Sequence, residues 1–346
     1  MKKPPIFVMI FVLMVSGVSL AYAGQYQWRC LYEDAQHNFR TGLQAQSLAL
    51  AKESLRKADV EYGTDSLYAL KSLTLVGDLY AASGAYSESA RYYRKALEVQ
   101  KKIFGSPHPN AAKLLNSLAV VEFKEGQVSD AKAKFAKSIE IADLSGHGSD
   151  PCMAESLLGM SEALKASGNH EESEKTLLAA LNILDNYSKY NPKLNLTIAN
   201  ARVSLAESLK AQAKYREANA QYRAAVKYFE TRGIASQKTM TDSLIAMGDC
   251  YVSSNKKARA LDCYKRALAA ANGNRGDDMT AALVSRRLAG VYKTVGNIPE
   301  ARRYYRLAVT SLENCSPSGC PLLADTQKSL GDLGEKSRKS VSDTPA

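Results

Sequence analysis

The sequence has 346 residues, of which 45% are hydrophobic and 23% charged, and 46 basic against 35 acidic side chains give a formal net charge of +11. This balance excludes an intrinsically disordered chain, which would have fewer apolar residues and a higher charge density. The positive excess is moderate for a chain of this length. Composition therefore predicts a folded protein and leaves its partner open.

Residues 1–23 have the pattern of a cleaved signal peptide. Two lysines follow the initiator methionine, residues 6–20 form an apolar run, and small residues flank Tyr22 just before Gly24. The alternative is an uncleaved membrane anchor, but the apolar run is shorter than the roughly 20 residues that a spanning helix needs. We therefore expect a mature chain that begins at Gly24.

Export has consequences for location and partner. The short, lysine-initiated signal is typical of bacteria, so we expect a periplasmic or secreted protein. Export disfavours nucleic acid as a partner. No later apolar stretch of the sequence is long enough to span a bilayer.

The remainder of the chain repeats one pattern, two amphipathic helices joined by a tight turn. In residues 75–109 the turn falls at Ser83-Gly84. The equivalent turn residues are Gly42, Gly84, Gly126, Gly168, Ala213, Asn255 and Gly296. Their spacings of 42, 42, 42, 45, 42 and 41 residues are typical of helical solenoids. The repeat therefore predicts an all-α fold.

Three columns of the repeat contain only small residues. Seven residues before the turn lie Ala35, Gly77, Ala119, Ser161, Ala206, Gly248 and Ala289. Five after it lie Ser47, Ser89, Ala131, Ser173, Ala218, Ala260 and Ala301, and twelve after it Ser54, Ala96, Ser138, Ala180, Ala225, Ala267 and Ala308. Nine after it come the large residues Tyr93, Phe135, Leu177, Tyr222, Tyr264 and Tyr305. Small residues permit two helices to approach closely, so these columns predict the helix crossings.

This order of small, turn, small, aromatic and alanine-aliphatic residues resembles the tetratricopeptide repeat, and the 42-residue period is similar to repeats of the kinesin light chain type. The resemblance covers roughly residues 27–338. It implies a right-handed α-solenoid of about seven helix-turn-helix repeats plus a C-terminal capping helix. The first repeat departs from the pattern, with Asp34 and Ala51 at positions that are usually apolar and aromatic, as terminal repeats often do.

We expect residues 24–338 to form one solenoid domain. Pro109, Pro151 and Pro321 each mark the first turn of the next helix, where the missing N–H is no loss. The stretch 321–337 predicts a lone capping helix, and residues 339–346 a disordered tail.

Possible chemistry is sparse in this sequence. The loop residues His147, Asp150 and Cys152 could supply three metal ligands, but they lack the paired spacing of a zinc site. No glycine-rich phosphate loop, nucleophile elbow or HExxH motif is present. We expect a protein that is not an enzyme and that needs no cofactor or metal.

The six cysteines suggest one disulfide. Cys315 and Cys320 flank a short Ser-Pro-Ser-Gly loop at the start of the capping helix, and we expect them to pair in an oxidising compartment. Cys250 and Cys263 lie on the two helices of the sixth hairpin and either pair or remain small buried thiols.

In the tetratricopeptide-like arrangement that the resemblance implies, the first helix of each repeat lines a concave groove. The register places polar side chains in it, of both signs and with a basic cluster towards the C-terminal end. They include Tyr32, Asp78, Asn116, Lys124, Glu162, Lys165, Glu207, Lys210, Asp249, Arg286, Arg287 and Lys293. Asn116 matches an inward Asn of kinesin light chain repeats, and the other repeats lack it.

Three functions are open at this point. The first, which we favour, is a scaffold of the cell envelope that binds a partner protein or extended peptide in the groove. The second is a binder of polyanions, such as acidic glycans or anionic lipid headgroups, through Arg286, Arg287, Lys293, Arg302 and Arg303. The third, an enzyme or its accessory domain, has the least support. The oligomeric state is left open.

Overall fold

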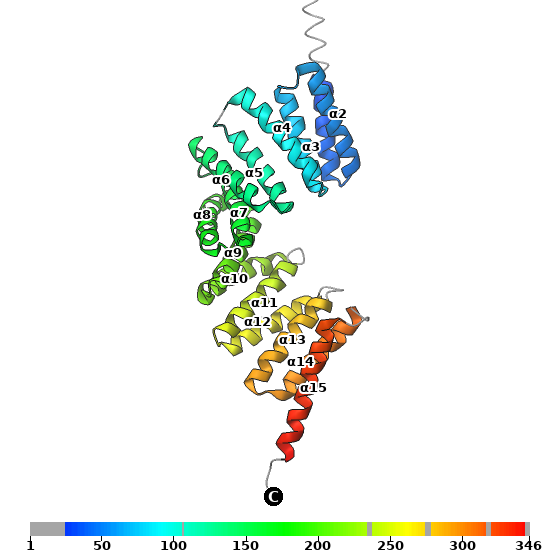
Figure 1. The fold of residues 1–346 in the computed structure, drawn as a ribbon, viewed down its shortest axis with the longest axis vertical. Coiled ribbons are helices and arrows are strands. Elements are labelled where there is room, and N and C mark those ends of the chain that lie inside the picture. Colours follow the sequence, from blue (N-terminus) through cyan, green and yellow to red (C-terminus); the bar gives the residue numbers. More distant parts are fainter. Residues whose placement is uncertain (1–24, 106, 234–236, 274–277, 316–319, 343–346) are drawn as a thin grey trace, which may run out of the picture. The chain divides into compact units, whose positions relative to one another are not determined.

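A computed structural model describes residues 25–105, 107–233, 237–273, 278–315 and 320–342, and the regular structure in these residues is helical (Figure 1). The predicted signal peptide at 1–23 and the last residues of the predicted tail, 343–346, lie outside the described residues.

The helices follow one another in pairs, as the repeat predicts. The first helix covers residues 25–40. It is followed by α2 (Gln44–Tyr62), α3 (Leu67–Ala82), α4 (Tyr86–Phe104), α5 (Pro109–Lys124), α6 (Val128–Leu144), α7 (Pro151–Ala166), α8 (His170–Ser188), α9 (Leu194–Ala211), α10 (Tyr215–Arg232), α11 (Gln237–Ser253), α12 (Lys257–Gly273), α13 (Asp278–Val295), α14 (Ile298–Cys315) and α15 (Pro321–Ser342).

The chain groups into two compact units, Met1–Gly168 and Asn169–Ala346, called unit 1 and unit 2 below. Within each unit every helix packs on the helix that precedes it and the helix that follows it (Figure 1). The fold is therefore all-α and of the solenoid type. That residues 24–338 form one domain stays a prediction.

All seven predicted turn residues have a left-handed backbone. The five glycines have φ between 77° and 85°, Ala213 has φ 58° and Asn255 has φ 55°. Glycine adopts this conformation at the end of a helix without steric strain, whereas a residue with a Cβ is destabilised by roughly 1–2 kcal/mol. The amide after the turn residue donates to a carbonyl of the preceding helix; Ala85 N, for example, lies 3.0 Å from Tyr80 O.

The three columns of small residues lie in the helix crossings. Their alanines and serines are buried throughout, with exposed fractions of 0–1%. The serines add hydrogen bonds across the crossing, because the Ser47 hydroxyl donates to Ala35 O at 2.7 Å and that of Ser89 to Gly77 O at 2.8 Å. The columns thus allow two backbones to approach closely, as the repeat predicts.

The large residues nine after each turn fill the space between crossings. Tyr93 and Tyr264 are 3% and 2% exposed. Each ring lies against a glycine of the first helix, so that a Cβ at Gly77 would lie 2.7 Å from the Tyr93 ring, and one at Gly248 2.4 Å from the Tyr264 ring. These two glycines are therefore required by packing and not by the backbone conformation.

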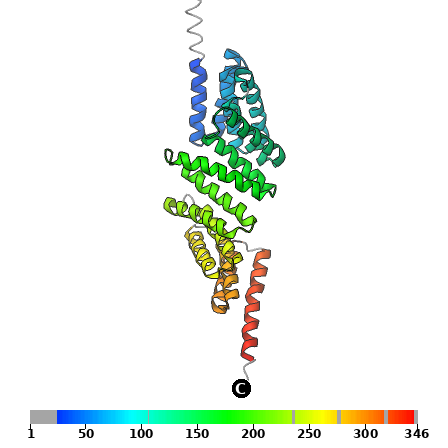
Figure 2. The same ribbon diagram turned by 90° about the vertical axis from the view of Figure 1, so that its left-hand side faces the viewer.

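The ends of the array are covered as the sequence predicts, with one difference in length. Trp28 is 6% exposed, packs on Ala58 and Ala69, and donates from Nε1 to Ser72 Oγ at 2.9 Å. Helix α15 follows α14 and packs on it (Figure 2). Its Leu333 is fully buried. The helix continues to Ser342, beyond the expected 337, because neither Gly nor Pro occurs between Glu335 and that residue.

Candidate binding surfaces

Three of the predicted groove residues converge in unit 2, each from the first helix of a successive repeat. Lys210 Nζ of α9 lies 3.3 Å from Asp249 Oδ2 of α11, and Arg287 of α13 pairs with Oδ1 of the same carboxylate. Tyr264 of α12 donates its hydroxyl to Asp249 Oδ1 at 2.6 Å. The three charged residues stand three, six and nine positions before their turns, so they form a diagonal row. Two cations share one carboxylate, which leaves a formal excess of one positive charge.

A cavity of about 460 Å³ adjoins this cluster. Asp249, Tyr264 and Arg287 line it together with Val252, Val291, Gly290 and the hydroxyl residues Ser253 and Thr294. Burial, and then the Asp249 carboxylate, raise the pKa of Tyr264 well above its ordinary value, so its hydroxyl keeps its proton. The cavity offers charged, hydroxyl and apolar groups at a position where the register predicts the groove.

In unit 1 the residue equivalent to Asp249 is Asp78, and neither of the two positions that contain cations in unit 2 contains one here. Tyr93 donates its hydroxyl to Asp78 Oδ1 at 2.6 Å, as Tyr264 does in unit 2. The two cation positions are occupied here by Phe39 and Ser117. Burial raises the pKa of Asp78 above its ordinary value, although the Tyr93 hydrogen bond acts in the opposite direction.

A second cavity, of about 590 Å³, lies in unit 1 between α5, α7 and the loop that precedes α7. Asn116 lines it, together with Lys113, Glu155 and the residues of the predicted loop motif. His147 Nδ1 lies 2.6 Å from Asp150 Oδ2, so this motif is held together by a hydrogen bond. The structure thus places Asn116 in a cavity, and its role in binding stays a prediction.

The cysteines and histidines do not form a redox or metal site in the described part of the chain. No group of three or more His, Cys, Asp and Glu side chains there is arranged to hold a metal. Burial raises the pKa of Cys152, and it raises the pKa values of Cys250 and Cys263 to about 11, so these three remain thiols.

Cys315 and Cys320 are both free thiols, so the expected disulfide is not formed in this structure. The Cys315 thiol is directed at the Leu312 carbonyl oxygen of its own helix, 3.6 Å away. The four residues between the two cysteines, 316–319, lie outside the described residues.

The other predicted groove residues occupy varied surroundings. Tyr32 stacks on Trp28 with ring centroids 5.1 Å apart, and Glu162 pairs with Lys165 at 3.0 Å along α7. Arg286 pairs with Asp325 of α15. Exposed or half-buried positions on their helices are taken by Lys124, Glu207 and Lys293. That these residues form one binding surface stays a prediction.

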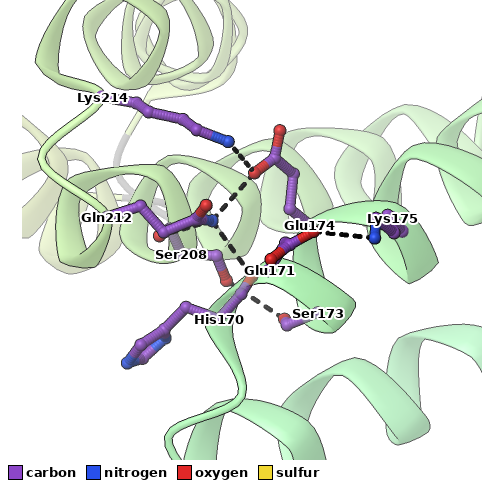
Figure 3. A network of polar contacts seen from close by, with 8 residues as sticks. All are labelled: His170, Glu171, Ser173, Glu174, Lys175, Ser208, Gln212 and Lys214. Atoms are coloured by element: carbon purple, nitrogen blue, oxygen red, sulfur yellow. Dashed lines mark hydrogen bonds and ion pairs between the residues drawn. The ribbon is translucent and has the colours of Figure 1, made fainter.

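A polar network fixes the turn of the fifth repeat to the start of α8 (Figure 3). Gln212 Nε2 donates to Glu174 Oε2 at 2.8 Å and to His170 O at 3.1 Å, and Lys214 Nζ lies 2.8 Å from the same Glu174 oxygen (Figure 3). Below them the hydroxyls of Ser173 and Ser208 lie 3.1 Å apart (Figure 3). Lys214 is the residue that precedes the first turn of α10, so this network ties the start of α10 to α8.

A further set of contacts, which the sequence reading missed, recurs where successive repeats meet. A cation ten residues after one turn reaches the residue four before the next turn. In repeats 2 and 3 this is Arg94 with Glu122, whose Oε1 lies 2.9 Å away; Lys134 completes the set, 2.7 Å from the other carboxylate oxygen. In repeats 5 and 6 it is Arg223, which donates to the Tyr251 hydroxyl at 3.2 Å.

The same positions in the outer repeats contain stacked tyrosines. Lys52 lies 5.1 Å from the ring centroid of Tyr80, which stacks on Tyr92, and Lys265 lies 5.8 Å from that of Tyr292. A recurring cation in the sequence would have indicated these contacts. The residues Lys52, Arg94, Arg223, Lys265 and Arg306 all stand ten residues after a turn.

None of the described helices combines the length and the apolar character needed to cross a membrane.

Comparison with known proteins identifies the repeats. The tetratricopeptide repeat family matches residues 72–144 and again residues 243–278. A relative from Arabidopsis thaliana, Protein Kinesin Light Chain-Related 2, is 24% identical over 241 residues, which cover 67% of this chain and 35% of the relative. The chain therefore spans about a third of the length of that relative.

Solved structures show the same fold at low identity. The tetratricopeptide-sensor signal transduction ATPase of the STAND class from Pyrococcus horikoshii aligns with a TM-score of 0.69 and 19% identity, over 91% of this chain and 45% of that one. The apo form of RapI gives 0.59 and 15% over 85% of this chain and all of RapI. BtubC from P. vanneervenii gives 0.58 and 16%, over 67% of this chain and 92% of BtubC.

The periodic turns, the buried small columns and these matches agree. The chain therefore contains tetratricopeptide repeats, at residues 72–144 and 243–278, and it is similar to a kinesin light chain-related protein.

Proposed function

We propose that this protein is a non-enzymatic scaffold of the cell envelope that binds an extended peptide or a helix of a partner protein on the face formed by the first helices of its repeats. The tetratricopeptide repeat fold supports a protein–protein interaction scaffold. The observation that carries the finer proposal is the Asp249 cluster in unit 2, where side chains from three successive repeats meet beside a cavity.

The geometry at Asp249 suits recognition of a polypeptide. Lys210 and Arg287 are held in place by the Asp249 carboxylate, which also accepts a hydrogen bond from the Tyr264 hydroxyl, so little side-chain entropy is lost when a ligand binds. Apolar groups of Val252 and Val291 lie beside these charges. Alternating apolar and charged groups of this kind match the side chains of an extended peptide.

Export is the second part of the proposal, and it rests on the signal-like segment 1–23. Its test is N-terminal sequencing of the protein recovered from the envelope fraction. A mature chain beginning at Gly24 supports export, whereas a chain that keeps residues 1–23 and fractionates with the cytoplasm contradicts it.

The alternative of a polyanion surface in the seventh repeat receives less support from the contacts there. Arg287 pairs with Asp249, Arg286 with Asp325, and Arg303 with Glu300. Arg302 donates to the Leu333 carbonyl oxygen at 3.2 Å. Four of the five cations that the sequence assigns to this surface therefore already have partners within the chain.

The groove proposal can be tested by site-specific photocrosslinking in cells that express the chain. A benzoylphenylalanine at Val252, which lines the cavity and is 43% exposed, is expected to give a discrete adduct with one polypeptide. The matched control is the same residue at Leu178, which is 49% exposed on the second helix of its repeat, and it is expected to give no such adduct.

The adduct at Val252 should disappear in the double variant Lys210→Glu, Arg287→Glu. Equal adducts from both crosslinking positions, or an adduct that this double variant leaves unchanged, would contradict groove binding.

A further inference from the structure

A small pocket in unit 2, away from the Asp249 cluster, is lined by four cations. It has a volume of about 300 Å³ and lies between α10 and the turn that joins α11 to α12. Arg216 and Arg223 line it from α10, Lys256 from the turn and Arg259 from α12. The helices α10 and α12 are the second helices of their repeats, so this pocket is not part of the proposed groove.

None of these four cations has a carboxylate partner among the described residues. The two contacts that they make within the chain are with a neutral ring: Arg223 Nη2 donates to the Tyr251 hydroxyl at 3.2 Å, and the Arg259 guanidinium lies 5.8 Å from the centroid of the same ring. All four are exposed to solvent, whereas Tyr251 is 6% exposed and forms part of the pocket wall. The pocket therefore holds four formal positive charges that form no ion pair with the described residues.

The corresponding position in unit 1 shows what compensation looks like in this fold. There Arg94 takes the place of Arg223, and Glu122 takes the place of Tyr251. Glu122 is 1% exposed and pairs with both Arg94 and Lys134. The positions of Lys256 and Arg259 are occupied by Gln127 and Asp130. Unit 1 thus neutralises the position internally, and unit 2 leaves it open for an anion from outside.

We propose that the pocket formed by Arg216, Arg223, Lys256 and Arg259 binds the phosphate group of a ligand. Guanidinium groups donate paired hydrogen bonds that match the oxygens of a tetrahedral oxyanion. A phosphate monoester carries about −1.5 to −2 charges at neutral pH, which suits several cations better than a single carboxylate does. The pocket volume of about 300 Å³ accommodates such a group.

The lining of the pocket also includes a buried polar group that has no hydrogen-bond partner among the described residues. Asn219 lines the pocket, is 4% exposed, and its side-chain oxygen has no such partner. A buried acceptor without a partner is unfavourable. A ligand hydroxyl, such as that of a monoprotonated phosphate or of the alcohol that it esterifies, would satisfy this acceptor. The start of α10, from which Arg216 projects, is fixed by the Gln212–Glu174–Lys214 network.

The first test measures binding of inorganic phosphate to the purified full-length chain by calorimetry, in chloride buffer of constant ionic strength. The double variant Arg223→Gln, Arg259→Gln is expected to lower the affinity by at least about tenfold, because each lost charge-assisted hydrogen bond is worth about a factor of ten. The control Arg302→Gln, Arg303→Gln removes the same charge from the seventh repeat, and we expect it to change the phosphate affinity by no more than about twofold.

A second arm distinguishes a lipid headgroup from a soluble phosphate compound. Phosphatidylcholine vesicles with and without phosphatidic acid are sedimented with the chain. Sedimentation that depends on phosphatidic acid and is lost in Arg223→Gln, Arg259→Gln assigns the headgroup of a lipid, and phosphate binding without sedimentation assigns a soluble phosphate. The proposal is overturned if neither probe binds, or if the two double variants reduce binding equally.

Discussion

Repeats 2 and 3 in unit 1 and repeats 5 and 6 in unit 2 use one geometry with a different partner for the same cation. In both pairs a cation ten residues after the first turn contacts the residue four before the second. In unit 1 that residue is Glu122, enclosed by two cations, and in unit 2 it is Tyr251, which leaves the cations without a carboxylate. A position that stabilises the fold in one unit can therefore serve as a ligand site in the other.

The first helices of the repeats, which form the proposed groove, show a comparable contrast between the two units. Asp78 and Asp249 each accept a hydrogen bond from a tyrosine hydroxyl at 2.6 Å. Asp249 also pairs with two cations, while Asp78 forms no ion pair within the described residues. The tetratricopeptide backbone register fixes where a side chain stands, and the chemistry at that place is free to change between repeats.

The largest effect is expected when the buried carboxylate of unit 1 loses both partners. The double variant Arg94→Ala, Lys134→Ala should lower the free energy of unfolding by about 3–5 kcal/mol, because Glu122 is left as an uncompensated buried charge. Urea denaturation followed by circular dichroism measures it.

The matched variant in unit 2 is Arg223→Ala, Arg259→Ala. It removes two exposed cations without leaving a buried charge, so we expect a change of no more than about 1 kcal/mol. Similar losses of unfolding free energy in the two double variants would contradict the claim that these cations stabilise the fold in unit 1 and not in unit 2.

A smaller effect tests the close approach of the helices. Gly248→Ala would place a Cβ 2.4 Å from the Tyr264 ring, and we expect overpacking to cost about 1–3 kcal/mol. Gly290→Ala, inside α13, meets nothing within 4 Å and should instead stabilise the chain by about 0.5–1 kcal/mol. Thermal unfolding of both variants measures the difference, and a shift of the same sign in each would show that the helix register assigned here is wrong.

The smallest effect is a pH dependence at Asp78. Because burial raises its pKa, the protonated form is favoured more in the folded chain than in the unfolded chain. Its contribution to stability is then greatest below the ordinary pKa of an aspartate and falls as the pH rises through the higher folded value. The variant Asp78→Asn should lose this dependence, so its unfolding free energy relative to the wild type rises between pH 3 and 7.

The matched measurement in unit 2 uses Asp249→Asn. Its carboxylate is held by two cations, so removal of the charge should destabilise the chain at neutral pH. If Asp78→Asn destabilises equally at neutral pH, the contrast between the two carboxylates does not hold.

Much of the fold could be predicted from the sequence because tight packing restricts residue size. Gly84 and its equivalents mark turns because the backbone there is left-handed, and Ala225 and Ala267 mark crossings because larger residues would not fit there. Such constraints recur in every repeat and are visible without coordinates. The same register placed Lys210, Asp249 and Arg287 among the groove candidates, but it did not predict that they contact one another.

The pocket around Arg223 could not be predicted in this way. Its function depends on which partner a cation has, and this changes from Glu122 in one repeat to Tyr251 in another at a fixed position. The sequence offered polyanion binding only as an alternative, and it placed that binding at the cations of the seventh repeat, where Asp325 and Glu300 pair with two of the arginines. Charge counts along a sequence do not reveal which charges are already paired.

The most direct test of this account places the carboxylate of unit 1 into the pocket of unit 2. The variant Tyr251→Glu places a carboxylate beside Arg223, as Glu122 lies beside Arg94, and Tyr251→Phe removes only the hydroxyl. With both variants folded, as judged by their helical circular dichroism, calorimetry should find phosphate binding lost in Tyr251→Glu and retained in Tyr251→Phe. Undiminished phosphate affinity in Tyr251→Glu would contradict the account.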